Sequence, residues 1–135
     1  MLASVGDLLL RIAVGGFLIP HGVQKLFGWF GADLAAERRV FEEVGLKPAG
    51  PWVVFIGAVE AVGGVLLVLG VLTRPAALVV AVNMLGTAWY VTHRGGWFWH
   101  RGGMEYSLFW AIAALVVFCY GGGPLSLDAL IGREF

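Results

Sequence analysis

At 135 residues the chain has the length of one domain, yet 59% of its residues are hydrophobic and its mean hydropathy is +0.85. A chain of this size cannot bury so much apolar surface in an aqueous core, so we expect lipid to be its solvent. Only 13% of its residues are charged and its formal net charge is zero, so the charge balance does not indicate a nucleic-acid partner. The single cysteine, Cys119, excludes an internal disulfide framework and a thiolate metal cage.

Four segments are apolar enough to cross a membrane, over about residues 5–27, 52–72, 76–90 and 105–120. A spanning helix needs about 20 mainly apolar residues, because it rises about 1.5 Å per residue through a hydrocarbon core about 30 Å thick. The first segment lacks a basic start and is longer than a signal core, so we expect a retained helix. We therefore predict an all-α fold, a transmembrane four-helix bundle of up-down antiparallel topology that forms one integral membrane domain over residues 1–135.

The connections differ in character. Residues 28–50 mix charged and apolar side chains, which predicts a short interfacial amphipathic helix, with a solvated loop as the alternative. The turn at Thr73, Arg74 and Pro75 is so short that the two spans beside it should form a helical hairpin. Residues 92–103 hold four glycines and two tryptophans, which predicts a flexible aromatic loop at the membrane surface.

Four spans place both chain ends on one face, here called the terminal face, and both long connections on the other, the loop face. The tryptophans lie on or near the loop face, as is typical of an interfacial aromatic belt, and Trp110, the deepest, is the candidate for stacking on a ligand. The loop face also carries most of the basic residues, so positive-inside counting predicts that it is cytoplasmic. These basic residues are Lys25, Arg38, Arg39, Lys47, Arg94 and Arg101.

Glu60 is the most informative residue, because it lies about two turns inside the second span. A charged side chain at such a depth costs roughly 2.5–3.5 kcal/mol on insertion scales. Gly57, Gly63 and Gly64 surround it at helical spacing, and such small residues let another helix approach closely. We therefore expect Glu60 to point into the bundle, either protonated or paired with a cation.

The first span offers such cations. His21 and Lys25 are four residues apart and share a helix face. The alternatives are purely structural roles: Lys25 extends to the membrane interface, and His21 bonds to a backbone carbonyl freed by Pro20. Near the terminal face, Asp7 and Arg11 are spaced for a local ion pair.

The third and fourth spans add further polar groups. Asn83, Thr87 and Tyr90 share a face and suggest hydrogen bonds between helices. Glu105 is at the start of the fourth span, where the helix dipole stabilises a carboxylate; alternatively, Glu105 belongs to a site. We predict a polar pocket with aromatic walls near the loop face and above Glu60. Its members are His21, Lys25, Tyr90, His93, His100 and Glu105.

A quinone suits such a pocket, because its ring can stack on aromatic side chains while its oxygens accept hydrogen bonds from His, Lys or Glu. A metal is less well supported, because no Glu-x-x-His pair occurs, and haem would have a single candidate axial ligand in His21. No phosphate loop, nucleotide fingerprint or nucleophile elbow is present.

At these residues the sequence resembles the DoxX family of small bacterial membrane proteins. The matching stretches are HGVQKLFGWFG (21–31), GAVEAVGGVLLVLGVLTR (57–74) and GGMEYSLFW (102–110). The resemblance implies a four-helix protein of the bacterial inner membrane and places His21, Lys25, Glu60, Glu105 and Tyr106 on motif positions. It also implies a redox theme, because members are linked to a thiosulfate:quinone oxidoreductase, to responses against catechols and quinones, and to a complex with superoxide dismutase and a sulfurtransferase.

Three functions compete. In the first, the chain is the membrane subunit of a quinone-linked oxidoreductase, with Glu60 and His21 relaying protons as catalytic residues. The residues expected to bind the ligand are Lys25, Glu105, Tyr106, Trp110, Tyr90 and Asn83. In the second, a non-catalytic scaffold recruits soluble redox or stress-defence enzymes through residues 33–47 and 94–101. The third, a proton-coupled carrier, lacks the inverted repeat that such carriers show, although a homo-oligomer built on glycine-rich faces would supply one.

Overall fold

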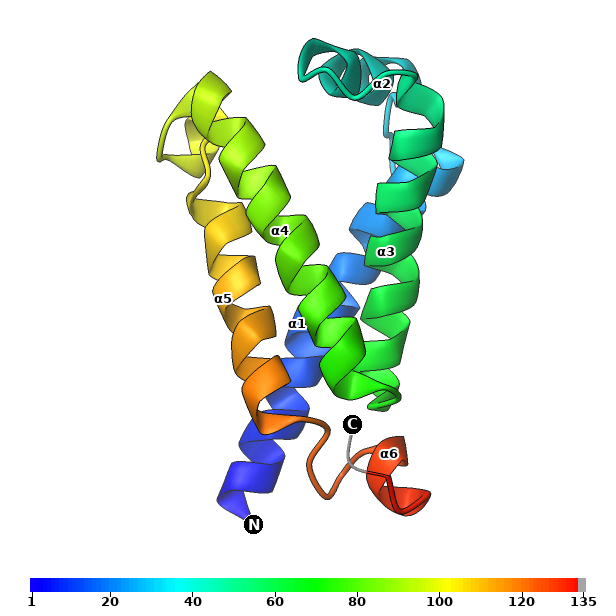
Figure 1. Ribbon diagram of the computed structural model, residues 1–135, viewed down its shortest axis with the longest axis vertical. Helices are drawn as coiled ribbons and strands as arrows, with labels where there is room; N and C mark the ends of the chain where they lie inside the picture. Colours follow the sequence, from blue (N-terminus) through cyan, green and yellow to red (C-terminus); the bar gives the residue numbers. More distant parts are fainter. Residues whose placement is uncertain (134–135) are drawn as a thin grey trace.

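The computed structural model describes residues 1–133, apart from the side chain of Arg94, so the part of the cytoplasmic and docking predictions that rests on that side chain lies outside the described residues. Within this part the chain is all-α and contains no strand, which confirms the predicted fold class (Figure 1). In chain order the elements are α1 (Leu2–Phe27), α2 (Leu34–Glu43), α3 (Ala49–Leu69), α4 (Thr73–Gly95), the 3-10 helix η1 (Trp99–Arg101), α5 (Glu105–Tyr120) and α6 (Leu127–Leu130).

Three helices, α1, α3 and α4, are long and apolar enough to cross a membrane, so the chain is a multi-pass membrane protein. The fourth long helix, α5, is apolar but has 16 residues. It is therefore about 24 Å long, somewhat less than a hydrocarbon core of about 30 Å. α4 begins at Thr73 and runs to Gly95, and so extends beyond both ends of the predicted span.

The long helices associate as two pairs, α1 with α3 and α4 with α5. The N-terminus and α6 lie at the terminal face, whereas α2 and η1 lie at the loop face (Figure 1). The hairpin of α3 and α4 forms, but its two helices diverge from their shared turn toward the loop face (Figure 1). This divergence decides where a ligand could enter.

Small residues hold α1 against α3. A Cβ on Gly22 would lie 2.6 Å from the carbonyl oxygen of Gly57, and a Cβ on Gly64 would lie 2.6 Å from that of Gly15. Real Cβ atoms do not approach backbone so closely, so only glycine allows this contact. The predicted close approach of another helix to the glycines of the second span is confirmed: the partner is α1 at Gly57 and Gly64, whereas Gly63 faces Val80 of α4.

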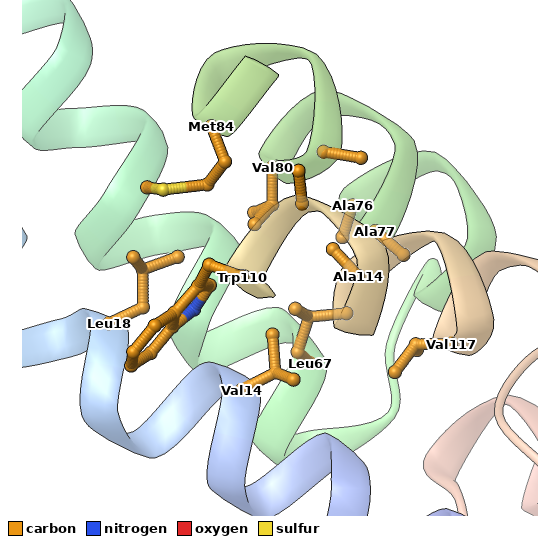
Figure 2. Packing of buried hydrophobic residues seen from close by; sticks show 12 residues of the cluster. Val14, Leu18, Leu67, Ala76, Ala77, Val80, Met84, Trp110, Ala114 and Val117 are labelled. Atoms are coloured by element: carbon orange, nitrogen blue, oxygen red, sulfur yellow. The ribbon is translucent and has the colours of Figure 1, made fainter. Parts of the chain in front are cut away.

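The apolar core is built by all four long helices and lies between the two pairs (Figure 2). Several of its members are alanines, which lets α4 and α5 approach each other closely. Its buried side chains are Val14, Leu18, Leu67, Ala76, Ala77, Val80, Ala81, Met84, Trp110, Ala111, Ala114 and Val117.

A group that we call the terminal-face network ties the C-terminal segment to the bundle. Its members are Asp7, Arg11, Thr73 and Asp128. The carboxylate of Asp128 accepts hydrogen bonds from Leu72 N, Thr73 N and Thr73 Oγ1 at 2.9, 3.0 and 2.9 Å, and so caps α4.

Arg11 is fully buried in the same network. Its Nε lies 3.5 Å from Asp7 Oδ2, which confirms the predicted local pair. Its two terminal nitrogens also donate to the carbonyl oxygens of Leu67, Val68 and Leu125 at 3.1, 3.4 and 2.7 Å, which the sequence did not indicate. Arg11 therefore joins three segments of the chain.

The linker helix expected between the first two spans is α2. Asp33 caps it by accepting hydrogen bonds from Ala35 N and Ala36 N at 2.9 and 3.2 Å. Tyr90 Oη donates to Val40 O at 3.4 Å, a long bond that links α4 to α2. No residue within α2 is buried, so this helix lies on the outside of the bundle.

Candidate functional site

The centre of the candidate site is an ion pair between α1 and α3. Lys25 Nζ donates to Glu60 Oε2 at 2.8 Å, and the two side chains are 15% and 5% exposed. The glycine contacts between α1 and α3 bring these side chains together, because Gly22 and Gly57 lie about one turn before Lys25 and Glu60. Glu60 thus points into the bundle and is paired with a cation, as expected from its surroundings.

Asn83 approaches this pair from α4. Its amide lies beside the Glu60 carboxyl and acts on it as a hydrogen-bonding neighbour. Among the described residues, however, neither its Nδ2 nor its Oδ1 finds a partner at ordinary hydrogen-bond geometry, although both atoms are buried. A buried amide usually has such a partner, so Asn83 has bonding capacity to offer a ligand.

The sequence suggested that Thr87 bonds to another helix, but the described part of the structure shows no such bond for its hydroxyl. Its hydroxyl donates to the backbone carbonyl of Asn83, one turn earlier in the same helix, at 3.0 Å. The prediction of an interhelical bond is therefore wrong for this residue, because a threonine hydroxyl can reach the carbonyl four residues before it.

A second cluster joins α1 to α5. His21 Nε2 and Tyr106 Oη are 3.1 Å apart. His21 therefore bonds to Tyr106, in place of the bond to a backbone carbonyl freed by Pro20 that the sequence offered as an alternative. The ring of Trp110 lies 6.4 Å from that of His21 and 5.0 Å from that of Tyr106, and the ring of Phe17 borders it at 6.4 Å. This cluster supplies an aromatic wall.

Trp110 differs from the other tryptophans. It is 8% exposed, whereas the remaining five are between 39% and 69% exposed, as suits residues at a membrane surface. Its buried Nε1 finds no acceptor in residues 1–133. The sequence singled out Trp110 by its depth, and the structure places its ring beside His21.

The two clusters act on each other electrostatically. The charge of Lys25 acts on the imidazole of His21, and that of Glu60 acts on the phenol of Tyr106. We call the combined group the loop-face site. Its members are His21, Lys25, Glu60, Asn83, Tyr106 and Trp110.

Glu37 of α2 was missed by sequence reasoning. It lies close enough to act on both His21 and Glu60. In the sequence it is one of several charged linker residues, and only the docking of α2 distinguishes it from the others.

Four residues predicted to converge on the pocket lie elsewhere. Glu105 Oε1 accepts from Trp99 N at 3.0 Å within the surface loop, and Tyr90 contacts α2. The ring of His93 packs on Trp89 at 5.2 Å, and that of His100 on Phe98 at 5.7 Å. The loop folds back through bonds from Met104 N to Gly96 O and from Glu105 N to Trp97 O, which directs its side chains to the surface. Ligand binding by Glu105 or Tyr90 therefore stays a prediction.

The described residues contain no group of three or more histidine, cysteine, aspartate or glutamate side chains placed to hold a metal ion. The side chains of the loop-face site instead offer hydrogen bonds and aromatic faces. Such a combination suits an organic ligand with polar atoms on a flat ring.

Comparison with known proteins gives a consistent picture. The family model described as DoxX matches residues 6–93. An uncharacterized protein of Haemophilus influenzae is 31% identical over 137 residues, which cover 98% of this chain and 87% of the relative. A Bacillus subtilis protein named "Putative oxidoreductase CatD" is 32% identical over 83 residues, covering 62% of this chain and 57% of that protein.

An uncharacterized membrane protein of Mycobacterium tuberculosis is also similar. It is 35% identical over 77 residues, which cover 57% of this chain and 45% of the relative. No solved structure matches the chain.

Proposed function

The chain belongs to the DoxX family of integral membrane proteins, and from this premise we propose that it is the membrane subunit of a redox system that binds a quinone at the loop-face site. The name of the Bacillus subtilis relative supports a redox role. The observation that carries the proposal is the unused hydrogen-bonding capacity of Asn83 and Trp110 next to a buried ion pair and an aromatic wall.

These residues fit a quinone. The oxygens of a quinone need hydrogen-bond donors, and Trp110 Nε1, Lys25 Nζ, Tyr106 Oη and the amide of Asn83 are donors of the site. Its ring needs an apolar or aromatic surface, which Trp110 and Phe17 provide. Trp110 is buried, whereas Tyr106 and Phe17 are 46% and 67% exposed and border the site at the outer surface of the bundle.

Each side chain has a separate role in this proposal. Reduction of a quinone takes up two protons and two electrons, and in this proposal a soluble redox partner of the membrane subunit supplies the electrons. Lys25 and Tyr106 orient the ring through its oxygens, while Glu60 and His21 hold and transfer protons at their carboxyl and imidazole groups. Trp110 excludes water from the ring. Glu105 holds the surface loop through Trp99, and this proposal assigns it no role at the ring.

The test is a titration of the purified protein with ubiquinone and menaquinone analogues in detergent, followed by tryptophan fluorescence. We expect saturable quenching, with a dissociation constant that Glu60→Gln or Trp110→Ala raises at least tenfold. Glu42→Gln is the matched control, because Glu42 is an exposed carboxylate of α2. Quenching that is linear in ligand and equal in all variants would mean partition into the micelle and would contradict the proposal.

One observation favours a second candidate, a scaffold that recruits soluble redox or stress-defence enzymes. α2 has no buried residue and presents the exposed side chains of Arg38 and Arg39 at the loop face. In this candidate, affinity purification recovers a soluble protein that the double substitution Arg38→Glu and Arg39→Glu releases. Recovery of the same proteins with both variants would exclude α2 as the docking element.

We further propose that the protein lies in the bacterial inner membrane with its loop face in the cytoplasm, on the basis of the basic residues on that face. A Gly31→Cys variant in a Cys119→Ser background tests the orientation, because Gly31 lies in the loop before α2. A membrane-impermeant thiol reagent should label it only after the cells are opened. Labelling of intact cells would reverse the orientation.

A further inference from the structure

An apolar groove lies between α3 and α4, where these helices diverge toward the loop face (Figure 1). Its volume is about 570 Å³, which is within the range of roughly 300–1,000 Å³ of ligand sites. Phe41, Val44 and Leu46, from α2 and the segment after it, border the groove as well. The groove is therefore formed by two membrane-spanning helices and bordered at one end by the linker helix.

The lining of the groove is almost entirely apolar. Trp52, Phe55 and Val59 contribute from α3, and Val79 and Val82 from α4. Val79 and Val82 are also 51% and 61% exposed, so the groove opens on the outer surface of the bundle, toward lipid. A chain of hydrocarbon can therefore enter it from the membrane without crossing a polar surface.

Three polar side chains line the groove, and two of them have partners within the protein. Thr87 donates to Asn83 O, and Tyr90 donates to Val40 O. The third is Asn83, whose amide atoms lack ordinary partners within residues 1–133 and lie beside Glu60. Asn83 thus belongs both to the groove and to the loop-face site.

We propose that this groove holds the hydrocarbon tail of the quinone, which enters laterally from the bilayer, while the ring reaches Asn83 beside Glu60. The inference rests on the proposed function and adds the substrate class, a quinone with a long tail. A tail gains little free energy of transfer from lipid into an apolar groove, because both surroundings are apolar. The groove is instead the path by which the tail of a ring held at Asn83 reaches the lipid, so a side chain that fills the groove should exclude tailed quinones sterically and leave tail-less ones unaffected.

Gly86 offers a way to fill the groove without disturbing the helices. It lines the groove, and a Cβ built on it meets no atom within 4 Å, so Gly86→Phe places a ring in open space. Gly16 of α1 is the matched control, because a Cβ on it also meets no atom within 4 Å and it lies outside the groove. Val82→Phe is a second obstructing variant at an exposed position.

The experiment measures dissociation constants for a tail-less dimethoxy-methyl-benzoquinone and for its decyl-tailed analogue, in one detergent at one concentration. We expect Gly86→Phe and Val82→Phe to weaken the tailed analogue at least tenfold and to change the tail-less one less than twofold. Gly16→Phe should change neither. Because all variants share the same micelles, partition of the tailed quinone cancels in the comparison.

The outcomes separate the two proposals. Unchanged affinity of both obstructing variants for the tailed analogue overturns the groove proposal, while saturable binding of the tail-less quinone that Glu60→Gln weakens leaves the proposed function standing. An equal loss for both quinones shows damage to the ring site and also overturns it. If neither quinone binds the unmodified protein, the proposed function fails, and the groove proposal fails with it.

Discussion

The terminal-face network and the loop-face site each bury a cation of α1 next to a carboxylate, yet they use them differently. At the terminal face, Arg11 donates to three carbonyl oxygens and Asp128 accepts three hydrogen bonds. At the loop face, a single hydrogen bond joins Lys25 to Glu60 in the described part of the chain, and the amide of Asn83 and the Nε1 of Trp110 lack ordinary partners.

This difference indicates separate purposes. Bonds to backbone carbonyls and to a helix cap hold segments of the chain in place. Within residues 1–133, the buried polar atoms of the network without a hydrogen-bond partner are Arg11 Nε and the Asp7 carboxylate oxygens, and their opposite charges compensate each other, with Nε 3.5 Å from Oδ2. Polar atoms that are buried without partners add nothing to stability, and they are retained where a ligand or water can use them. We therefore expect substitutions in the network to affect stability and substitutions in the site to affect binding.

The largest expected effect is that of Arg11→Met. Methionine keeps much of the apolar volume but leaves Asp7 and the three carbonyl oxygens without their partner, which should lower the free energy of unfolding by about 3–5 kcal/mol. Circular dichroism during titration with dodecyl sulfate in mixed micelles measures this change. Arg39→Met is the control, since the Arg39 side chain is 67% exposed and its ion pair should contribute less than about 1 kcal/mol. A loss below about 1 kcal/mol for Arg11→Met would erase the distinction between the two regions.

The next effect concerns the contact that positions the loop-face site. A methyl group at Gly22 would meet the backbone of Gly57 and Ala61, so Gly22→Ala should lower the free energy of unfolding by about 1–3 kcal/mol and should weaken quinone binding by displacing Lys25 from Glu60. Gly16→Ala meets no atom and should not destabilise the protein. The same unfolding titration compares the two. Equal stability of the two variants would show that α1 and α3 can move apart without lowering the free energy of unfolding.

A double-mutant cycle on Lys25 and Glu60 tests the proposed division directly. Each of Lys25→Met and Glu60→Gln leaves its partner poorly compensated, and the double variant removes both charges, so we expect a coupling of roughly 0.5–3 kcal/mol in the free energy of unfolding. Quinone binding should remain lost in the double variant, although its stability recovers. Recovery of binding together with stability would assign the pair a structural role only.

The smallest effect is expected for Tyr106→Phe, which removes the hydrogen bond to His21. The net loss of stability should be about 0.5–1.5 kcal/mol, at the lower end because this bond is accessible to solvent. Quinone affinity should fall several-fold, because a donor to the ring is lost. Tyr120→Phe, at the other end of α5 and 71% exposed, is the control and should change neither quantity. Equal affinities for the two variants would remove Tyr106 from the site.

The membrane class and the approximate helices could be predicted because they depend on local properties. The number of consecutive apolar residues determines which segments can enter lipid, and short polar turns determine where they end. The inward direction of Glu60 was also local information, since its glycine neighbours mark the face on which another helix can lie. Lys25 was recognised as a cation of the first span, but the sequence could not decide whether it pairs with Glu60 or extends to the membrane interface.

The sequence by itself thus determined that this chain is an all-α membrane protein with an acidic residue turned into its bundle. Only the tertiary structure decided which groups meet, because His21 and Tyr106 are 85 residues apart and Asp128 caps a helix 55 residues before it. Such contacts depend on how the helices cross and diverge, and helical spacing along the sequence does not contain that information. The same divergence opens the groove beside Asn83. The folding of the surface loop on itself keeps Glu105 and His100 away from the site, and His93, which belongs to α4, packs on Trp89.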